Sequence, residues 1–193
     1  MKKLIFATGN PNKIKEVNQL LDGLFPVIGM REIGCTEEVP ETQNTLQGNA
    51  LQKARYLKDN YKYDCFSEDT GLEIDALDGA PGVITAHYAG PERDAIANME
   101  KVLLELKDKE DRGAQFRTVI ALIWEGKEHL FEGIVRGRIA LERSGEKGFG
   151  YDPIFIPEGY DQTFANIGAT EKNSISHRGR AVKQLIDFFK KSK

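Results

Sequence analysis

Residues 65–76 read Cys-Phe-Ser-Glu-Asp-Thr-Gly-Leu-Glu-Ile-Asp-Ala, and they place two adjacent carboxylates, Glu68 and Asp69, inside an apolar pattern. The apolar approach and the alternation after Gly71 predict two strands that meet at these carboxylates. Two carboxylates at a strand end are costly to bury unless cations or hydrogen-bond donors meet them. Their oxygens suit Mg²⁺, and a carboxylate beside a metal-bound water can act as a general base. Taken alone, the stretch favours a solvated acidic turn, so a functional interpretation needs partners elsewhere in the chain.

The composition limits the class of protein. The chain of 193 residues is long enough to bury a sizeable core, and we expect one domain, residues 1–193, with room for two lobes. Its net charge of −3 supplies no basic surface for nucleic acid. No apolar run approaches the about 20 residues of a membrane span, and the chain becomes polar too early for a signal peptide. Cys35 and Cys65 form neither a metal-ligand spacing nor a disulfide framework, so we expect a cytoplasmic protein.

The N-terminal segment predicts an anion site. Leu4 to Ala7 is a continuous apolar run typical of a buried strand, and it ends in the turn Thr8-Gly9-Asn10-Pro11-Asn12-Lys13. Asn10 can cap a helix whose first residue is Pro11, where the missing N–H costs nothing. The exposed N–H groups and the helix dipole attract anions, and Lys13 adds a cation. The alternative is an ordinary strand-to-helix turn with a surface lysine.

Other segments complete the predicted order of elements. The acidic segment 37–42, which contains Glu41, is best interpreted as a solvated loop, and Thr45 can cap the helix that follows. Lys53 lies in that helix and points either at a ligand or at water. The remaining predicted elements are a strand at 26–30, a helix at 93–106, a hairpin of strands at 116–124 and 128–140, a strand at 154–156 and a terminal helix after Ser176.

Two further segments carry residues suited to a nucleotide. Glycines on both sides of Phe149 let the backbone approach a ligand and leave the ring free to stack on a base, with Asp152 as a nearby acceptor. The alternative is a tight loop with Phe149 in the core. Ser176 places His177 and Arg178 in the first turn of the terminal helix, where cations oppose the helix dipole. That arrangement favours an anion or an electron-rich base opposite them.

Five motifs, in order, resemble the inosine triphosphate pyrophosphatase family over essentially the whole chain. They are Ala-Thr-Gly-Asn-Pro-Asn-Lys (7–13), Glu-Asp-Thr-Gly-Leu (68–72), Asp-Gly-Ala-Pro-Gly (78–82), Gly-Phe-Gly-Tyr-Asp-Pro (148–153) and Ser-His-Arg-Gly (176–179). The resemblance implies an elongated α/β fold with a long mixed sheet flanked by helices, and two lobes with the active cleft between them. It also implies a homodimer that uses Mg²⁺ to hydrolyse ITP, dITP and XTP to the monophosphate and pyrophosphate.

The resemblance assigns roles to individual residues. Asp69 would be the general base and, with Glu41 and Glu68, would engage the metal. The triphosphate-binding residues would be Thr8, Gly9, Asn10, Pro11, Asn12 and Lys13. The further substrate-binding residues would be Thr70, Phe149, Gly150, Tyr151, Asp152, Lys172, His177 and Arg178. Donors at Arg178 or His177 would meet the 6-keto oxygen of hypoxanthine or xanthine, where adenine presents a donor; such a mismatch costs about 1–3 kcal/mol.

One position departs from the family pattern, and two other functions compete with this one. His87 stands where the family commonly has arginine, which replaces a permanent cation by a group whose charge depends on pH. A regulator that holds a purine triphosphate without cleaving it is one alternative, but a mere binder would avoid two anions beside a polyphosphate. A phosphatase of pyrimidine or modified triphosphates is the other, and the motif at Ser176 to Arg178 speaks against it.

Overall fold

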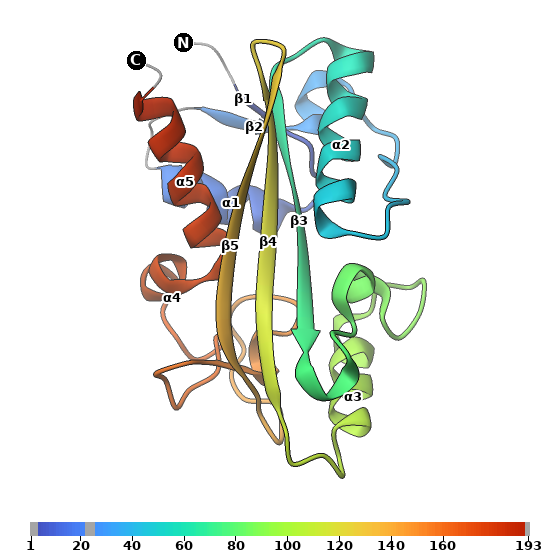
Figure 1. Cartoon of the computed structure of the whole chain (residues 1–193), viewed down its shortest axis with the longest axis vertical. Helices are drawn as coiled ribbons and strands as arrows, with labels where there is room; N and C mark the ends of the chain where they lie inside the picture. The colour runs from blue at the N-terminus through green and yellow to red at the C-terminus, as the bar shows by residue number, and fades with distance from the viewer. Residues whose placement is uncertain (1–3, 22–25, 192–193) are drawn as a thin grey trace. The chain divides into compact units, whose positions relative to one another are not determined.

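The computed structural model describes residues 4–21 and 26–191, and it contains a six-stranded mixed sheet with flanking helices (Figure 1). The strand order is β2-β1-β3-β4-β5-β6; β1 pairs in parallel with β2 and β3, and β5 pairs antiparallel with β6. The strands are β1 (Leu4–Phe6), β2 (Val27–Gly29), β3 (Cys65–Ile74), β4 (Gly113–Trp124), β5 (Lys127–Ile139) and β6 (Phe155–Pro157). The α-helices are α1 (Pro11–Leu21), α2 (Leu46–Tyr61), α3 (Ala95–Glu105), α4 (Ala169–Ile175) and α5 (His177–Lys191). The α/β class with a mixed sheet is therefore as predicted.

The chain divides into two compact units. The first contains Met1–Asp69, Thr118–Gly133 and Arg178–Lys193, and the second contains Thr70–Arg117 and Ile134–His177. None of the helices within residues 4–21 and 26–191 is long and apolar enough to cross a bilayer.

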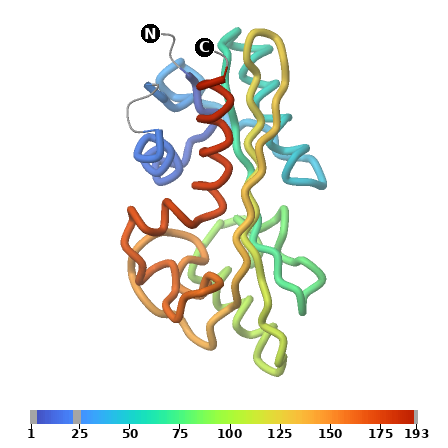
Figure 2. Tube along the Cα trace, turned by 60° about the vertical axis from the view of Figure 1, so that its left-hand side comes forward, coloured from blue at the N-terminus to red at the C-terminus, as the bar shows by residue number. Residues whose placement is uncertain are grey.

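In the first unit, α1 and α5 cover one face of the sheet. Both views of the chain place them on the same side of the strands (Figures 1 and 2). Their buried side chains form one core with β1, β2, β3 and β4, made of Leu4, Phe6, Val17, Leu21, Val27, Phe66, Ile120, Leu122, Ala181, Val182, Leu185 and Phe189. Phe6 and Phe66 stack at 4.4 Å between ring centroids, which joins the parallel strands β1 and β3 at this core.

The helix α2 contacts β3 through residues that alternate with this core. Cys65 Sγ donates to the Ala54 carbonyl and Ser67 Oγ donates to the Ala50 carbonyl. Because successive side chains of a strand point to opposite faces, Cys65, Ser67 and Asp69 face α2, whereas Phe66 and Glu68 face α1 and α5. The pleat of β3 therefore separates the two adjacent carboxylates.

The continuity of β3 corrects the predicted turn at the carboxylates. Residues 65–74 form a single ten-residue strand, so Glu68 and Asp69 lie in its middle and not at a strand end. Gly71 is needed for close packing: a Cβ added there would lie 2.8 Å from the Gly82 carbonyl oxygen. This close approach accompanies a bridge between Glu73 and Pro81. Gly71 thus allows β3 to pack closely against the segment that contains Pro81 and Gly82.

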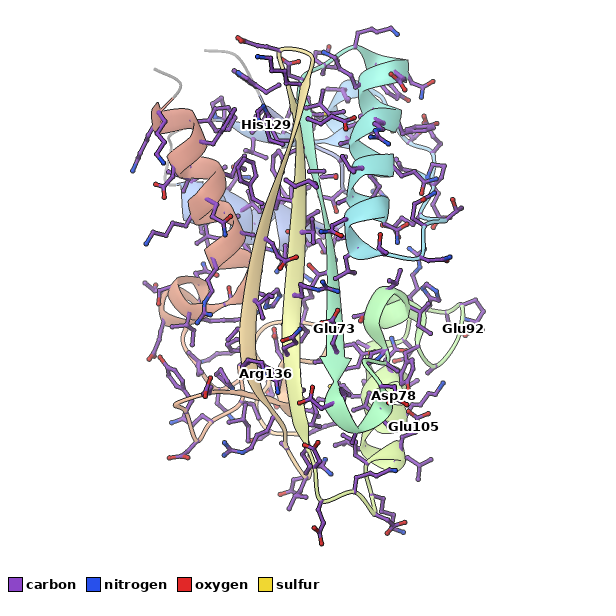
Figure 3. All side chains as sticks on the ribbon, in the orientation of Figure 1. Glu73, Asp78, Glu92, Glu105, His129 and Arg136 are labelled. Atoms are coloured by element: carbon purple, nitrogen blue, oxygen red, sulfur yellow. The ribbon has the colours of Figure 1, made fainter. Side chains whose placement is uncertain are left out.

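The second unit has its own core beneath α3. Its members are Leu72, Ile74, Met99, Val102, Leu106, Ala114, Phe116, Val135, Ile139, Tyr151, Ile154, Phe155, Phe164 and Ile167. Along β5, Arg136 and Arg138 are exposed while Val135 and Ile139 are buried, as the alternation predicts; Arg136 is labelled in Figure 3. The short helix α4 was not predicted.

The helices α2 and α5 begin, and the β4–β5 hairpin turns, at the residues that the sequence predicts. Thr45 caps α2 by accepting from the Gly48 N–H at 3.0 Å, and His177 begins α5 directly after Ser176. The predicted hairpin forms between β4 and β5, with positive φ angles of 50° at Glu125 and 78° at Gly126. Positive φ at both central residues is typical of the tightest hairpin turns.

Candidate functional site

The turn at residues 8–13 has the geometry expected of an anion site. Asn10 Oδ1 accepts from the Asn12 N–H at 2.9 Å and the Lys13 N–H at 3.4 Å, so it caps α1. Thr8 Oγ1 accepts from the Asn10 N–H at 3.1 Å, which tightens the turn. Pro11 is the first residue of α1, as predicted. The N-terminus of an eleven-residue helix and the Lys13 ammonium lie at the same end of this element.

Glu68 lies in a buried ion-pair network on the α1 and α5 face of β3. Its carboxylate accepts from Arg178 Nε at 2.9 Å and Nη2 at 2.7 Å, and Lys13 Nζ lies 3.1 Å away. Arg178 also donates from Nη1 to Glu16. Burial alone would raise the pKa of the Glu68 carboxyl, but the charges of Arg178 and Lys13 outweigh burial and hold that pKa below its ordinary value. Glu68 therefore stays ionised and holds two cations in place.

Asp69 lies on the other face of β3, among side chains of α2. Its Oδ1 lies 3.3 Å from Lys53 Nζ, and its Oδ2 accepts from Asn49 Nδ2 at 3.2 Å. Lys53 also donates to Glu41, so its ammonium joins the two carboxylates. Asp69 is 8% exposed, and Asn49 and Lys53 are buried. The result is a carboxylate with one donor on each oxygen and little access to solvent.

This environment tunes Asp69 toward base chemistry. Burial raises the pKa of the Asp69 carboxyl, and the opposing charges of Lys53 and Lys13 do not cancel that rise. For Lys53, burial lowers the pKa, but Asp69 and Glu41 together raise it above its ordinary value, so the ammonium stays charged. A carboxylate whose pKa is raised accepts a proton more readily than an ordinary one. Asp69 is thus the stronger candidate base of the adjacent pair.

Glu41 and Asp69 also fit a divalent cation. Both meet at the Lys53 ammonium, which shows that the two carboxylates converge on a position that a cation can occupy. Within residues 4–21 and 26–191 there is no cluster of three or more His, Cys, Asp or Glu side chains suited to a metal. Mg²⁺ commonly binds through one or two carboxylates together with substrate phosphates and waters. The pair therefore suits an ion that arrives with a polyphosphate, whereas Glu68 faces away from it.

The second unit brings Phe149, Asp152 and Lys172 together. Asp152 Oδ2 accepts from the Phe149 N–H at 2.7 Å and from Lys172 Nζ at 2.7 Å. Lys172 Nζ lies 5.3 Å from the centroid of the Phe149 ring. Asp152 and Lys172 are buried, while Phe149 is half-buried. The buried carboxylate thus fixes both the loop backbone and the ammonium beside an accessible aromatic face.

The side chains of Tyr151 and His177 are buried and contact other residues of this unit. Tyr151 donates its hydroxyl to the Thr85 carbonyl at 2.8 Å and is buried. His177 is 4% exposed, and its ring stacks on Phe116 with 4.6 Å between centroids. Thr70 is half-buried in β3, directly after Asp69.

Gly148 is the residue on which the loop around Phe149 depends most. Its φ angle is +76°, and a Cβ placed there would lie 2.0 Å from Asp152 Oδ2. We expect Gly148→Ala to lower the free energy of unfolding by about 1–3 kcal/mol beyond backbone strain, because the carboxylate must move. The KM for the substrate should rise with it, since Phe149 and Lys172 both depend on Asp152.

The matched control is Gly126→Ala. Gly126 has a φ angle of +78° and no atom within 4 Å of an added Cβ, so only the left-handed strain of about 1–2 kcal/mol remains. Denaturant unfolding and substrate titration of both variants give the comparison. Equal destabilisation of the two variants would contradict the role given to Asp152.

The predicted residues therefore fall into separate groups. The first unit holds Lys13, Glu68 and Arg178 in one network, and Glu41 with Asp69 in another. The Nε, Nη1 and Nη2 atoms of Arg178 donate to carboxylates here, and its contact with a base carbonyl stays a prediction. The Glu68 carboxylate pairs with Lys13 and Arg178, and its role at a metal likewise stays a prediction.

Sequence reasoning missed Asn49 and Glu16, and it left Lys53 undecided. The signal was the helical spacing of Asn49 and Lys53, four residues apart on one face of α2. If residues 65–74 are taken as one continuous strand, the alternation of its side chains places Asp69 on the face toward α2. Glu16 carries no comparable signal, since its partner Arg178 lies 162 residues further along the chain.

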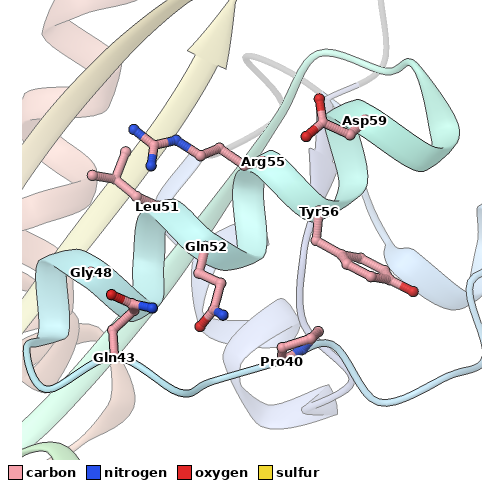
Figure 4. A pocket seen from close by; sticks show the side chains of 8 residues that line it. All are labelled: Pro40, Gln43, Gly48, Leu51, Gln52, Arg55, Tyr56 and Asp59. Carbon is pink, nitrogen blue, oxygen red and sulfur yellow. The ribbon is translucent and has the colours of Figure 1, made fainter.

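A pocket of about 340 Å³ lies beside α2 but outside both groups (Figure 4). It is lined by Pro40, Gln43, Gly48, Leu51, Gln52, Arg55, Tyr56 and Asp59. Its cation, Arg55, is paired with Glu128 at 2.6 Å. None of the predicted site residues lines it.

Comparisons with known proteins agree over nearly the full chain. A sequence profile of the Ham1 family matches residues 4–188. A Flavobacterium psychrophilum protein named dITP/XTP pyrophosphatase is 53% identical over 188 residues, which cover 97% of this chain and 99% of that protein. A Bacillus subtilis protein with the same name is 47% identical and covers 96% of each. The solved structure of the Staphylococcus aureus Ham1 protein matches with a TM-score of 0.90 and 36% identity, covering 100% of both chains.

Proposed function

Because the chain belongs to the Ham1 family, we propose that it hydrolyses non-standard purine nucleoside triphosphates, namely ITP, dITP and XTP, to the monophosphate and pyrophosphate. Relatives that cover nearly the whole chain carry the name dITP/XTP pyrophosphatase. The single observation that best supports this reaction is the buried Asp69 carboxylate, held by Lys53 and Asn49 next to Glu41. This arrangement combines a tuned proton acceptor with a second carboxylate for a cation.

In the proposed reaction, water attacks the α-phosphorus and the bond to the bridging oxygen of the β-phosphate breaks. Asp69 accepts the proton of the attacking water. Pyrophosphate leaves with that bridging oxygen, and the water oxygen stays on the monophosphate. Lys13 and the backbone N–H groups at the start of α1 stabilise the charge of the triphosphate and of the departing pyrophosphate.

Glu41 and Asp69 would hold the Mg²⁺ ion in this proposal. When bound, the ion neutralises polyphosphate charge and polarises the bond that breaks. The Lys53 ammonium would add positive charge for the phosphate oxygens beside these carboxylates. Glu68 acts at a distance, by holding Lys13 and Arg178.

The second unit would recognise the base. Phe149 offers the stacking face, and Lys172 offers a donor for the 6-keto oxygen of hypoxanthine or xanthine. Asp152 holds both groups. Adenine presents an amino group at the same position, so a donor would meet a donor and lose a hydrogen bond. Gly150, Tyr151 and His177 support this loop and core, and Thr70 contacts the substrate beside Asp69.

The test of the proposed specificity is a comparison of kcat/KM for dITP, XTP, dATP and dGTP with Mg²⁺ present. We expect dITP and XTP to exceed dATP by at least about tenfold, which is the effect of one unpaired polar group. Equal rates for all four triphosphates would reject the proposal. Light scattering of the purified protein tests the predicted homodimer, and the cytoplasmic location also stays a prediction.

A further inference from the structure

Three residues of α2 hold three consecutive residues of the segment that carries Glu41. Lys53 donates to Glu41, Gln52 exchanges two hydrogen bonds of 2.9 Å with Thr42, and Asn49 Oδ1 accepts from the Gln43 N–H at 2.8 Å. Asn49, Gln52 and Lys53 are spaced i, i+3 and i+4, so they share one face of the helix. Figure 4 shows Gln52 pointing from α2 toward the segment between Pro40 and Gln43.

Gly48 permits this close packing. A Cβ added at Gly48 would lie 2.7 Å from Gln43 Cβ, so any larger residue would push the segment away from α2. The segment therefore lies against the helix backbone itself.

Asn49 differs from Gln52 because it also contacts Asp69. Its Nδ2 donates to Asp69 Oδ2 at 3.2 Å while its Oδ1 accepts from the Gln43 N–H. The orientation of the amide is fixed, because the flipped form would set NH₂ against N–H and carbonyl oxygen against carboxylate. Asn49 is 3% exposed, so water does not replace either bond at low cost. Lys53 takes the other oxygen of Asp69, and the two donors together set the plane of the carboxylate.

We propose that Asn49 is a positioning residue of the reaction, which fixes the orientation of Asp69 relative to the segment that carries Glu41. This role rests on the proposed function, in which Asp69 is the base and Glu41 holds the metal. Only a side chain with one donor and one acceptor satisfies both neighbours. Supporting hydrogen bonds of this kind typically change activity or metal affinity by about 10–100-fold.

The test compares three variants by steady-state kinetics with dITP, at saturating Mg²⁺ for kcat and KM and over a Mg²⁺ titration for the metal requirement. Asn49→Leu removes both hydrogen bonds, and Asn49→Asp keeps the acceptor for Gln43 but removes the donor to Asp69. Gln52→Leu is the matched control, since it releases Thr42 from α2 without touching Asp69. We expect both Asn49 variants to lose about 10–100-fold in kcat while the KM for dITP stays within about threefold. Gln52→Leu should keep kcat within about threefold and require more Mg²⁺ for half-maximal rate.

The outcomes distinguish a failure of the positioning role of Asn49 from a failure of the proposed function. If Asn49→Leu does not fold by circular dichroism, Asn49→Ala decides in its place, because it removes both hydrogen bonds and adds no charge beside Asp69. If the wild type is active and the Asn49 variants keep a normal kcat, the positioning role of Asn49 is wrong but the proposed function stands. The same holds if Gln52→Leu loses as much kcat as the Asn49 variants. A wild type that does not hydrolyse dITP overturns the proposed function, and the role of Asn49 with it.

Discussion

Asp69→Asn should lower kcat for dITP hydrolysis by about 10²–10⁴-fold, the usual contribution of a general base. The amide keeps the size of the side chain and one oxygen, but it cannot accept a proton at neutral pH. Binding of dITP should persist, because Lys13, the turn at residues 8–13 and the loop around Phe149 are unchanged. Calorimetric titration of the inactive variant with dITP measures this directly.

A matched control for this variant is Asp75→Asn. Asp75 follows β3 directly and pairs with Arg136 at 2.6 Å, but it is exposed and has no part in the proposed site. Its kcat should stay at the wild-type value. Turnover retained in Asp69→Asn, or lost equally in both variants, would remove Asp69 as the base.

The second large effect is on stability. Arg178→Leu should lower the free energy of unfolding by about 3–5 kcal/mol, because it leaves the Glu68 carboxylate buried without its main partner. Arg178 is 2% exposed and Glu68 is 1% exposed, so water cannot replace the lost hydrogen bonds. Denaturant unfolding at neutral pH measures the loss.

The exposed pair of Arg55 and Glu128 is the control. It has the same two-pronged geometry, at 2.6 and 2.8 Å, but the Arg55 side chain is 54% exposed. Arg55→Leu should therefore cost only about 0–1 kcal/mol. If Arg55→Leu and Arg178→Leu lowered the free energy of unfolding by similar amounts, burial of the Arg178–Glu68 pair would not explain its effect.

The same network predicts a pH dependence with a definite sign. The depressed pKa of Glu68 means that the pair stabilises the folded protein above the ordinary carboxyl value of 4.5, and that this contribution fades as pH falls further. In Arg178→Leu the Glu68 carboxyl loses the larger of the two charges that lower its pKa, so protonation at low pH removes part of the cost of burying it. The gap in unfolding free energy between wild type and variant should narrow on acidification. A gap that widens would contradict the account.

Local signals in the sequence were enough to predict much of the fold. Asn10 with Pro11, Thr45, and the dipeptide Glu125-Gly126 each act within a few residues, and each begins or turns an element where expected. The helix α4 was missed because its seven residues, Ala-Thr-Glu-Lys-Asn-Ser-Ile, carry no apolar period.

Contacts between segments that are separate in the sequence account for the features of the site that were not predicted. The stretch around Gly71 was interpreted as a solvated turn, whereas Gly71 lies within β3 and packs against the backbone of Gly82. The pairing of Arg178 with Glu68, which lies 110 residues earlier in the chain, was not predicted. The strand that contains both carboxylates places them on opposite faces, so one holds cations in the core while the other is available for chemistry.

Phosphorus NMR of the products of dITP hydrolysis shows most directly which anhydride linkage of the triphosphate breaks. The proposed attack at the α-phosphorus predicts dIMP and pyrophosphate in equal amounts, with no transient dIDP. Release of orthophosphate together with dIDP would contradict it.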